Sequence, residues 1–162
     1  MNYQLYSQLD STKKVRYQAL YLEIGGPSTI TSLNYEMGLF QYNRLKLNAR
    51  IGVGFTRLND FHLNFNPDLT FPIGLNSTFL LSDKKKGALS FELMGGNTFS
   101  TYIRANHNYQ PEREFDSHGY ISTGPSWIFT KGVYTRLAYC LLLENYSTPF
   151  HWGGLSIGYI FK

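Results

Sequence analysis

Histidines and one Asp-Ser-His sequence are the residues with the clearest capacity for catalysis or metal binding. The four histidines are His62, His107, His118 and His151. None of them has the HExxH or HxH spacing of a metal site. Asp116 and Ser117 precede His118 and supply the residue types of a hydrolytic triad, but adjacent residues of an extended chain point in opposite directions. The sequence therefore predicts no metal site, no cofactor and no catalytic residues.

A second group of ionisable side chains alternates with apolar residues along the chain. It consists of Glu23, Glu36, Arg50, Glu92, Arg136 and Glu144. Carboxylates and guanidinium groups neutralise one another in a confined space, and the planar arginine fork can bridge two carboxylates. We therefore expect these residues to form a charge network in the interior of the fold. A gated conduction path built from Glu36, Arg50, Glu92 and Arg136 is the alternative.

The segment 44–56 shows which kind of element must position these charges. Its sequence is RLKLNARIGVGFT, in which every second residue is apolar. A helix, with its 100° step, would scatter those residues around its axis, whereas a strand places all of them on one face. The segment is close in length to the roughly nine to eleven residues of a strand that crosses a bilayer. It predicts a membrane-spanning strand with Arg50 on its polar face.

The same alternation recurs along the rest of the chain. Strands are expected at about 17–25, 32–41, 44–56, 71–79, 87–98, 120–129, 133–144 and 153–162. Pro72 falls near the start of its strand, where proline is tolerated, whereas Pro125 falls inside its strand and should weaken it. Short turns, such as GGPS at 25–28, alternate with long connections. The long connections are expected at 56–70, 102–117 and 145–152.

This arrangement of strands is typical of the smallest membrane barrels. It predicts an all-β fold, an eight-stranded antiparallel up-and-down transmembrane β-barrel. Residues 1–16 are expected to form a polar tail, and residues 17–162 a single barrel domain. The polar sequence after Met1 contains no apolar signal region, so we expect an export signal to have been removed.

Composition favours a barrel that lies in a membrane. Charged residues make up 16% of the 162-residue chain, against roughly 25% in a soluble domain. No apolar run approaches the roughly 18 residues of a membrane helix, so strands must do the crossing. The net charge of +4 comes from dispersed side chains apart from the lysines at 84–86, which gives no basic stripe for nucleic acid. The single cysteine, Cys140, excludes an intramolecular disulfide and is expected to face inward.

Volume decides which face of the strands lies inside the barrel. An eight-stranded barrel has room for small side chains or one small ligand, and four or more large residues from each strand would overfill it. The polar face is rich in glycine and carries both signs of charge, so it has the right bulk. We therefore expect the apolar face to meet lipid through Leu45, Leu47, Ile51, Val53, Phe55, Leu137, Leu141, Ile157 and Phe161. A soluble barrel that binds an apolar ligand is the alternative with the opposite orientation.

Three short sequences carry a family resemblance: EIGG at 23–26, SLNYE at 32–36 and SIGY at 156–159. Together with the aromatic-rich last strand, they make the chain similar to small outer-membrane β-barrel proteins of the Bacteroidetes type. The resemblance covers nearly the whole chain in its strand pattern. It implies an integral protein of a Gram-negative outer membrane, with both termini in the periplasm and the long connections outside the cell.

These expectations describe a non-enzymatic membrane protein with a structural or partner-binding role. Its contacts would be outer-membrane lipid and neighbouring outer-membrane proteins, as in an accessory subunit of a larger envelope complex. The alternative from another functional class is an enzyme that modifies lipid A or another envelope lipid, with hydrolase or acyltransferase activity at the outer rim.

Overall fold

A computed structural model describes most of the chain. The described residues are 17–28, 30–60, 64–84, 87–105, 110–129, 131–143 and 149–161. The predicted polar tail, residues 1–16, lies outside them. Within the described residues, no helix is long and apolar enough to cross a membrane.

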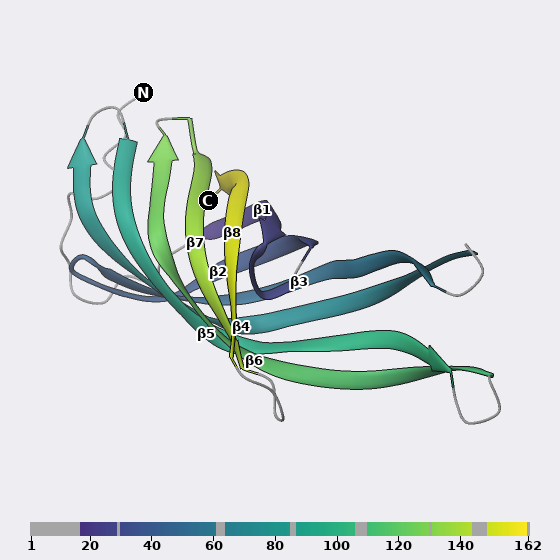
Figure 1. Ribbon diagram of the computed structural model, residues 1–162. Coiled ribbons are helices and arrows are strands. Elements are labelled where there is room, and N and C mark those ends of the chain that lie inside the picture. Colours follow the sequence, from purple (N-terminus) through teal and green to yellow (C-terminus); the bar gives the residue numbers. More distant parts are fainter. Residues whose placement is uncertain are drawn as a thin grey trace.

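Eight antiparallel strands form a closed barrel in chain order (Figure 1). The strands are β1 (Gln18–Gly25), β2 (Thr31–Tyr42), β3 (Leu45–Asp60), β4 (Asn64–Lys84), β5 (Gly87–Ala105), β6 (Pro111–Phe129), β7 (Val133–Leu143) and β8 (Phe150–Phe161). A single turn of 3-10 helix, η1 (Gly26–Ser28), connects β1 to β2. The prediction of an eight-stranded up-and-down antiparallel barrel is confirmed.

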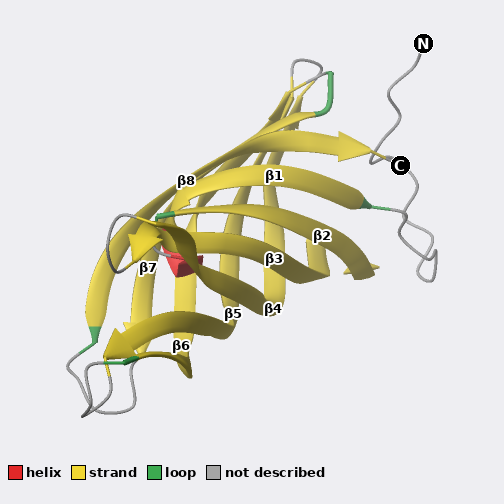
Figure 2. Ribbon diagram, turned by 90° about the vertical axis from the view of Figure 1, so that its right-hand side faces the viewer, coloured by secondary structure: helices red, strands yellow, loops and turns green. Residues whose placement is uncertain are grey.

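The first and last strands close the ring. β1 pairs with β8 from Gln18↔Phe161 to Gly25↔Gly154, and β1 also pairs with β2 on its other side. Figure 2 shows the strands curving around a common interior. Because every strand of the wall has two neighbours, the wall has no open edge that could pair with another chain.

Side chains alternate between the interior and the outer surface along each strand. In β3, Arg50 is 3% exposed and the next residue, Ile51, is 57% exposed. In β7, Arg136 is 1% exposed and the next residue, Leu137, is 55% exposed. Charged residues therefore face inward, together with a small apolar cluster that includes Met94 and Leu142, and the exposed outer face is apolar, which is the reverse of a soluble barrel.

Both prolines of the wall lie inside long strands. Pro72 falls well inside β4, which begins at Asn64, so the prediction that it lies near a strand start is wrong. Pro125 does not end or shorten β6, which is 19 residues long. The ladder skips Pro72 on its β3 side and Pro125 on its β7 side, while both residues remain in register with β5. Proline lacks an amide donor, and interrupting one ladder accommodates that loss without breaking the strand.

The predicted long connections are largely strand, which corrects the sequence-based boundaries. β3 and β4 continue past the last β2 pair, Thr31↔Phe55, as far as Asp60 and Asn64. β5 and β6 continue to Ala105↔Pro111, and β8 already begins at Phe150. Figure 1 shows these extensions projecting from one end of the barrel. Their sequences are largely polar and lack the apolar alternation of the wall, yet they remain strand.

We name the two extensions by their strands. The β3–β4 arm consists of residues 56–60 and 64–69, and the β5–β6 arm of residues 101–105 and 110–118. The arms are last joined to each other at the pair Thr70↔Ser100. Beyond that pair, the ladders of the described residues run within each arm and not between the two arms.

Replacing Gly158 with alanine should weaken the closure between β1 and β8. A Cβ at this position would overlap the carbonyl oxygen of Leu20 and the Cβ of Tyr21. We expect the free energy of unfolding to fall by about 1–3 kcal/mol, measured by urea denaturation of the barrel in lipid vesicles. Gly153→Ala is the matched control, because no atom lies within 4 Å of its Cβ position. Equal losses for the two variants would contradict the described β1–β8 packing.

Candidate functional site

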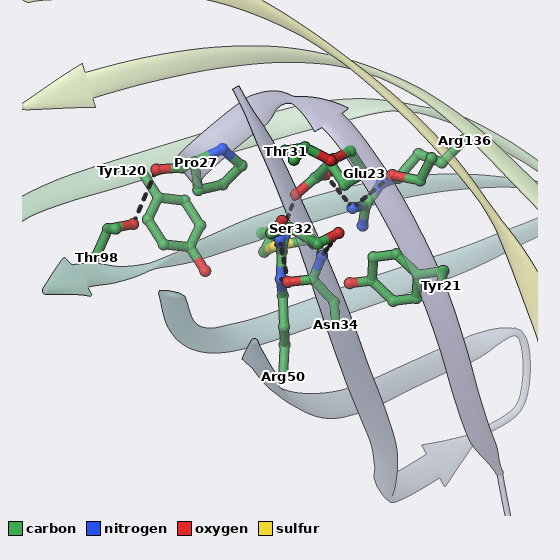
Figure 3. Close-up of polar contacts among 12 residues, drawn as sticks. Tyr21, Glu23, Pro27, Thr31, Ser32, Asn34, Arg50, Thr98, Tyr120 and Arg136 are labelled. Atoms are coloured by element: carbon green, nitrogen blue, oxygen red, sulfur yellow. Dashed lines mark hydrogen bonds and ion pairs between the residues drawn. The ribbon is translucent and has the colours of Figure 1, made fainter. Parts of the chain in front are cut away.

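The centre of the barrel interior is an ion cluster that joins β1, β3 and β7. The Glu23 carboxylate accepts hydrogen bonds from Nη2 of Arg50 through Oε2, and from Nη2 of Arg136 through Oε1 at 2.7 Å. Ser156 of β8 donates to the same Oε1 at 3.2 Å. All three charged side chains are buried (Figure 3). One carboxylate therefore binds and orients two arginines that are far apart in the sequence.

Neutral groups fix the Arg50 guanidinium in place. Asn34 Oδ1 accepts from Arg50 Nε at 3.1 Å and from Nη2 at 2.8 Å. The sulfur of Met94 lies 2.9 Å from Nη1. Ser32 Oγ in turn accepts from Asn34 Nδ2 at 2.8 Å, which sets the orientation of the amide. Each nitrogen of the Arg50 guanidinium thus has a partner in the interior, as a buried charge requires.

Two further carboxylates extend the network across the barrel. The side-chain amide of Asn76 donates to Glu36 Oε1 at 3.1 Å and to Glu92 Oε2 at 2.8 Å. Tyr134 donates to Glu92 at 2.9 Å, and Arg136 Nη1 lies 3.3 Å from Glu92 Oε2. Arg136 consequently bridges Glu23 and Glu92, and Asn76 links Glu92 to Glu36.

Glu36 is held by neutral donors. Asn48 Nδ2 donates to its Oε1 at 2.8 Å, and the phenol of Tyr21 lies 3.4 Å from its Oε2. The Tyr21 ring also faces both guanidinium groups, with the carbon of Arg136 5.1 Å and that of Arg50 5.6 Å from its centroid. Tyr21 thus ties the Glu36 side of the network to the ion cluster through cation–π contacts and a hydrogen bond.

The buried charges of the described residues nearly balance. Four carboxylates, Glu23, Glu36, Asp68 and Glu92, are buried together with two arginines and Lys46. The Lys46 ammonium lies 5.2 Å from the centroid of the Tyr17 ring. A small net charge is what a low-dielectric interior favours, because a large excess charge of either sign would be costly to desolvate.

The connection between β1 and β2 folds into one mouth of the barrel. Gly25 and Gly26 adopt φ values of 74° and 72°, which glycine reaches without strain. They turn η1 inward, where all three of its residues are buried (Figure 2). The carbonyl of Pro27 accepts from Thr98 Oγ1 at 3.0 Å (Figure 3). It also accepts from the His118 ring at 3.2 Å. This segment, here called the plug, is therefore fastened to β5 and β6.

The plug rests directly on the ion cluster. A Cβ added to Gly26 would lie 2.8 Å from the Glu23 carboxyl carbon. Sequence reasoning treated residues 25–28 as an ordinary turn and missed the plug. The available signal was the pair of glycines before a proline, since a tight left-handed turn that approaches another group needs residues without a Cβ.

The structure brings together five of the six predicted network residues. Glu23, Glu36, Arg50, Glu92 and Arg136 all lie inside the barrel, and Glu144 lies outside the described residues. Lys46 also faces inward, whereas Arg44 is exposed in the turn after β2. Sequence reasoning did not identify the amides of Asn34, Asn48 and Asn76, although their positions on the polar face of alternating segments carried that signal.

The nine residues predicted to meet lipid lie on the outer face of the barrel. The exposed ones are Leu45, Ile51, Val53, Leu137, Ile157 and Phe161. The half-buried ones are Leu47, Phe55 and Leu141. Cys140 lies on the opposite, inner face and is fully buried.

The residues considered for catalysis have other surroundings. His118 binds the Pro27 carbonyl of the plug, and Asp116 accepts from the backbone amide of Ser117 at 2.7 Å. His151 is hydrogen-bonded to the Tyr139 phenol, and both residues are exposed. His62 and His107 lie outside the described residues. Among the described part of the chain, no three His, Cys, Asp or Glu side chains are grouped to hold a metal ion.

The fold and its inward-facing polar network define the class of protein, a closed eight-stranded antiparallel β-barrel. The chain is similar in structure to the N-terminal β-barrel domain of OprF from Pseudomonas aeruginosa, with a TM-score of 0.57 and 12% sequence identity. The similarity covers 90% of this chain and 96% of that domain. At this identity the likeness shows a common fold. No protein-family model and no curated protein sequence matches the chain.

Replacing Glu23 with glutamine should strongly destabilise the barrel. The change leaves Arg50 without its carboxylate partner and Arg136 with Glu92 alone. Breaking a buried ion pair from one side costs about 3–5 kcal/mol, and urea denaturation in lipid vesicles would measure it. Asp83→Asn, at an exposed strand end, is the matched control and should leave stability unchanged. A loss for Glu23→Gln as small as that of the control would contradict the role of the cluster.

Proposed function

We propose that the chain is an integral β-barrel protein of a Gram-negative outer membrane with a structural or partner-binding role. The observation that carries this proposal is the inverted distribution of side chains, with buried charges inside and exposed apolar residues outside. The likeness to the OprF barrel domain supports the same kind of barrel. From the sequence resemblance, the proposal further includes a barrel of the Bacteroidetes type. Both chain termini would lie in the periplasm, and the arms would lie outside the cell.

The outer wall fits lipid better than water. Ile51, Leu137 and Ile157 come from three different strands and are each more than half exposed. Contiguous apolar surface over a whole barrel wall would cause aggregation in water, whereas contact with acyl chains stabilises it. Aromatic side chains such as Phe71 and Phe99 face each other across β4 and β5 on this wall, and interfacial girdles use such residues.

The interior supports a structural role in preference to a pore. Arg136, Glu23, Tyr21 and Tyr134 are among the largest fully buried side chains, and all of them belong to the interior network. Water in an open channel would reach such groups, so their burial indicates a filled lumen. The plug covers the network at the mouth next to the arms. The protein would then act through its wall and its arms.

The alternative, an enzyme that modifies an envelope lipid, has less support. Its candidate base, His118, faces the plug and binds a backbone carbonyl. Ser117 is the preceding residue of the same strand, so its side chain points to the opposite face. The two side chains therefore do not converge on a common substrate position.

An arginine in place of Ile51 should impair membrane insertion. A charged side chain on the lipid face costs about 2–4 kcal/mol near the bilayer midplane and much less towards the interfaces. Folding into lipid vesicles, followed by the heat-modifiable band on gels and by urea titration, would measure the loss. Phe115→Arg is the matched control, because Phe115 lies on the β5–β6 arm and is 81% exposed. Equal insertion of the Ile51 variant and the control would contradict a lipid-facing wall.

In planar bilayers the inserted protein should give no stable conductance steps. Buried side chains and the plug occupy the interior of the described barrel, so we expect them to block a water-filled path along its axis. A large-pore porin added to the same bilayer would show that single openings are detectable. Reproducible ohmic steps from the purified barrel would contradict the filled lumen.

A further inference from the structure

The short turns at the end of the barrel opposite the arms all contain basic residues. Arg44 lies in the turn between β2 and β3, and Lys131 lies in the turn between β6 and β7. Both residues are exposed. The third short turn, between β4 and β5, has three consecutive lysines in the sequence, at 84–86. We call this end of the barrel, with its three turns, the turn end.

The arms have the opposite balance of charge. The segments 56–69 and 101–118 contain three arginines and five acidic residues. Arg57 is in register with Asp68, and Arg104 is in register with Glu112, so arginines of the arms stand opposite carboxylates. The segments 43–44, 83–86 and 130–132 of the turn end contain five basic residues and one acidic residue, Asp83. Positive charge is therefore in excess at the turn end and not in the arms.

The backbone fixes the positions of two of these turns. The carbonyl of Arg44 accepts from the amide of Leu80 at 2.8 Å, which ties the β2–β3 turn to β4. The carbonyl of Gly132, the residue after Lys131, accepts from the amide of Ile160 at 2.8 Å, which ties the β6–β7 turn to β8. Each turn is thus bonded to a strand outside its own hairpin. The two basic side chains start from fixed points on the rim of the wall.

Exposed aromatic side chains lie next to these turns. They come from five strands and comprise Tyr42, Phe79, Phe91, Trp127, Phe129 and Tyr159. A Cβ added to Gly132 would lie 3.2 Å from two carbons of the Tyr159 ring, so that ring packs directly against the turn of Lys131. Aromatic residues of membrane proteins concentrate at the boundary between acyl chains and headgroups. The basic turns lie just beyond this aromatic belt.

The height of the apolar wall places Arg44 at a bilayer surface. The outward residues of β3 begin with Leu45, directly after Arg44, and continue to Phe55, ten residues further along. Ten residues at about 3.3 Å each, in a strand tilted by about 40°, span about 25 Å along the barrel axis. This equals the height of the apolar band of a membrane barrel, about 25 Å. A wall immersed in acyl chains therefore brings the turn end to the level of the lipid phosphates.

We propose that the turn end binds the headgroups of acidic phospholipids. The Arg44 guanidinium and the Lys131 ammonium donate hydrogen bonds to the lipid phosphates, and the acyl chains of the same lipids lie along the aromatic belt. This inference rests on the proposed function, because it names the class of lipid that the barrel wall would select. The charge excess predicts a preference for acidic over zwitterionic phospholipid at this end of the barrel.

Quenching of Trp127 fluorescence by brominated lipid tests the inference on the full chain in vesicles. Replacing Trp152 with phenylalanine leaves Trp127 as the single tryptophan. The vesicles contain phosphatidylglycerol and phosphatidylcholine in equal amounts, with bromine on the acyl chains of one lipid or of the other. We expect phosphatidylglycerol to bind beside Trp127 about fivefold more strongly, the factor expected for one basic side chain at an anionic surface. Equal quenching by the two lipids would overturn the inference.

The source of the preference is tested by removing single charges. Lys131→Gln should abolish the preference at Trp127. Arg57→Gln, which removes one exposed positive charge from the β3–β4 arm, is the matched control and should preserve it. High salt should reduce the preference of the unsubstituted turn, since screening weakens exposed charges. A preference that persists in Lys131→Gln, or that resists salt, would overturn the inference.

Arg44 is tested on the β2–β3 turn with a second reporter. Tyr42→Trp, combined with phenylalanine at both native tryptophan positions, places the fluorophore two residues from Arg44. Arg44→Gln should abolish the lipid preference at this reporter, and an unchanged preference would overturn the role of Arg44. The heat-modifiable gel band verifies that each variant is inserted. An inserted barrel without lipid preference overturns the inference alone, whereas failure of the wild type to insert overturns the proposed function.

Discussion

The Glu23 carboxylate makes the interaction on which the rest of the barrel depends. It binds Arg50 from β3 and Arg136 from β7, although these residues are far apart in the sequence. Each of these charges is costly to bury, and the cluster is favourable only while all partners are present. Closure of β8 onto β1 brings Arg136 of β7 to the carboxylate that Arg50 of β3 approaches across β2. The network and the closed ring therefore stabilise each other.

This arrangement also explains the outer surface and the plug. A narrow interior filled by Arg136, Tyr21 and Tyr134 leaves no room for the large apolar residues that alternate with them, such as Leu22 and Leu137, so those residues lie outside. The same crowding requires glycine at Gly26, where the plug meets Glu23. The arms begin where the ladder between β4 and β5 ends, and their sequences no longer alternate between polar and apolar residues.

Alternation in the sequence was enough to predict the strands of the wall, since a period of two places Arg50 and Ile51 on opposite faces whatever the neighbours are. It could not predict how far the strands continue, because in the arms both faces are polar and the period disappears. Strand propensity was misleading at Pro125, which was expected to weaken its strand. The ladder to β7 skips this residue, so the missing amide hydrogen does not break β6. The plug depends on a tertiary contact between Pro27 and His118, which no local pattern reveals.

Collision accessibility of spin labels tests the central claim most directly. Labels would be placed singly at Val53, Leu137 and Ile157 in a Cys140→Ala background, with a label at Phe115 as the aqueous reference, and the protein would be folded into lipid vesicles. The account predicts high accessibility to oxygen and low accessibility to a water-soluble nickel chelate at the three wall positions, with the reverse at Phe115. Wall positions that are as accessible to the nickel chelate as Phe115 would contradict the lipid-facing wall.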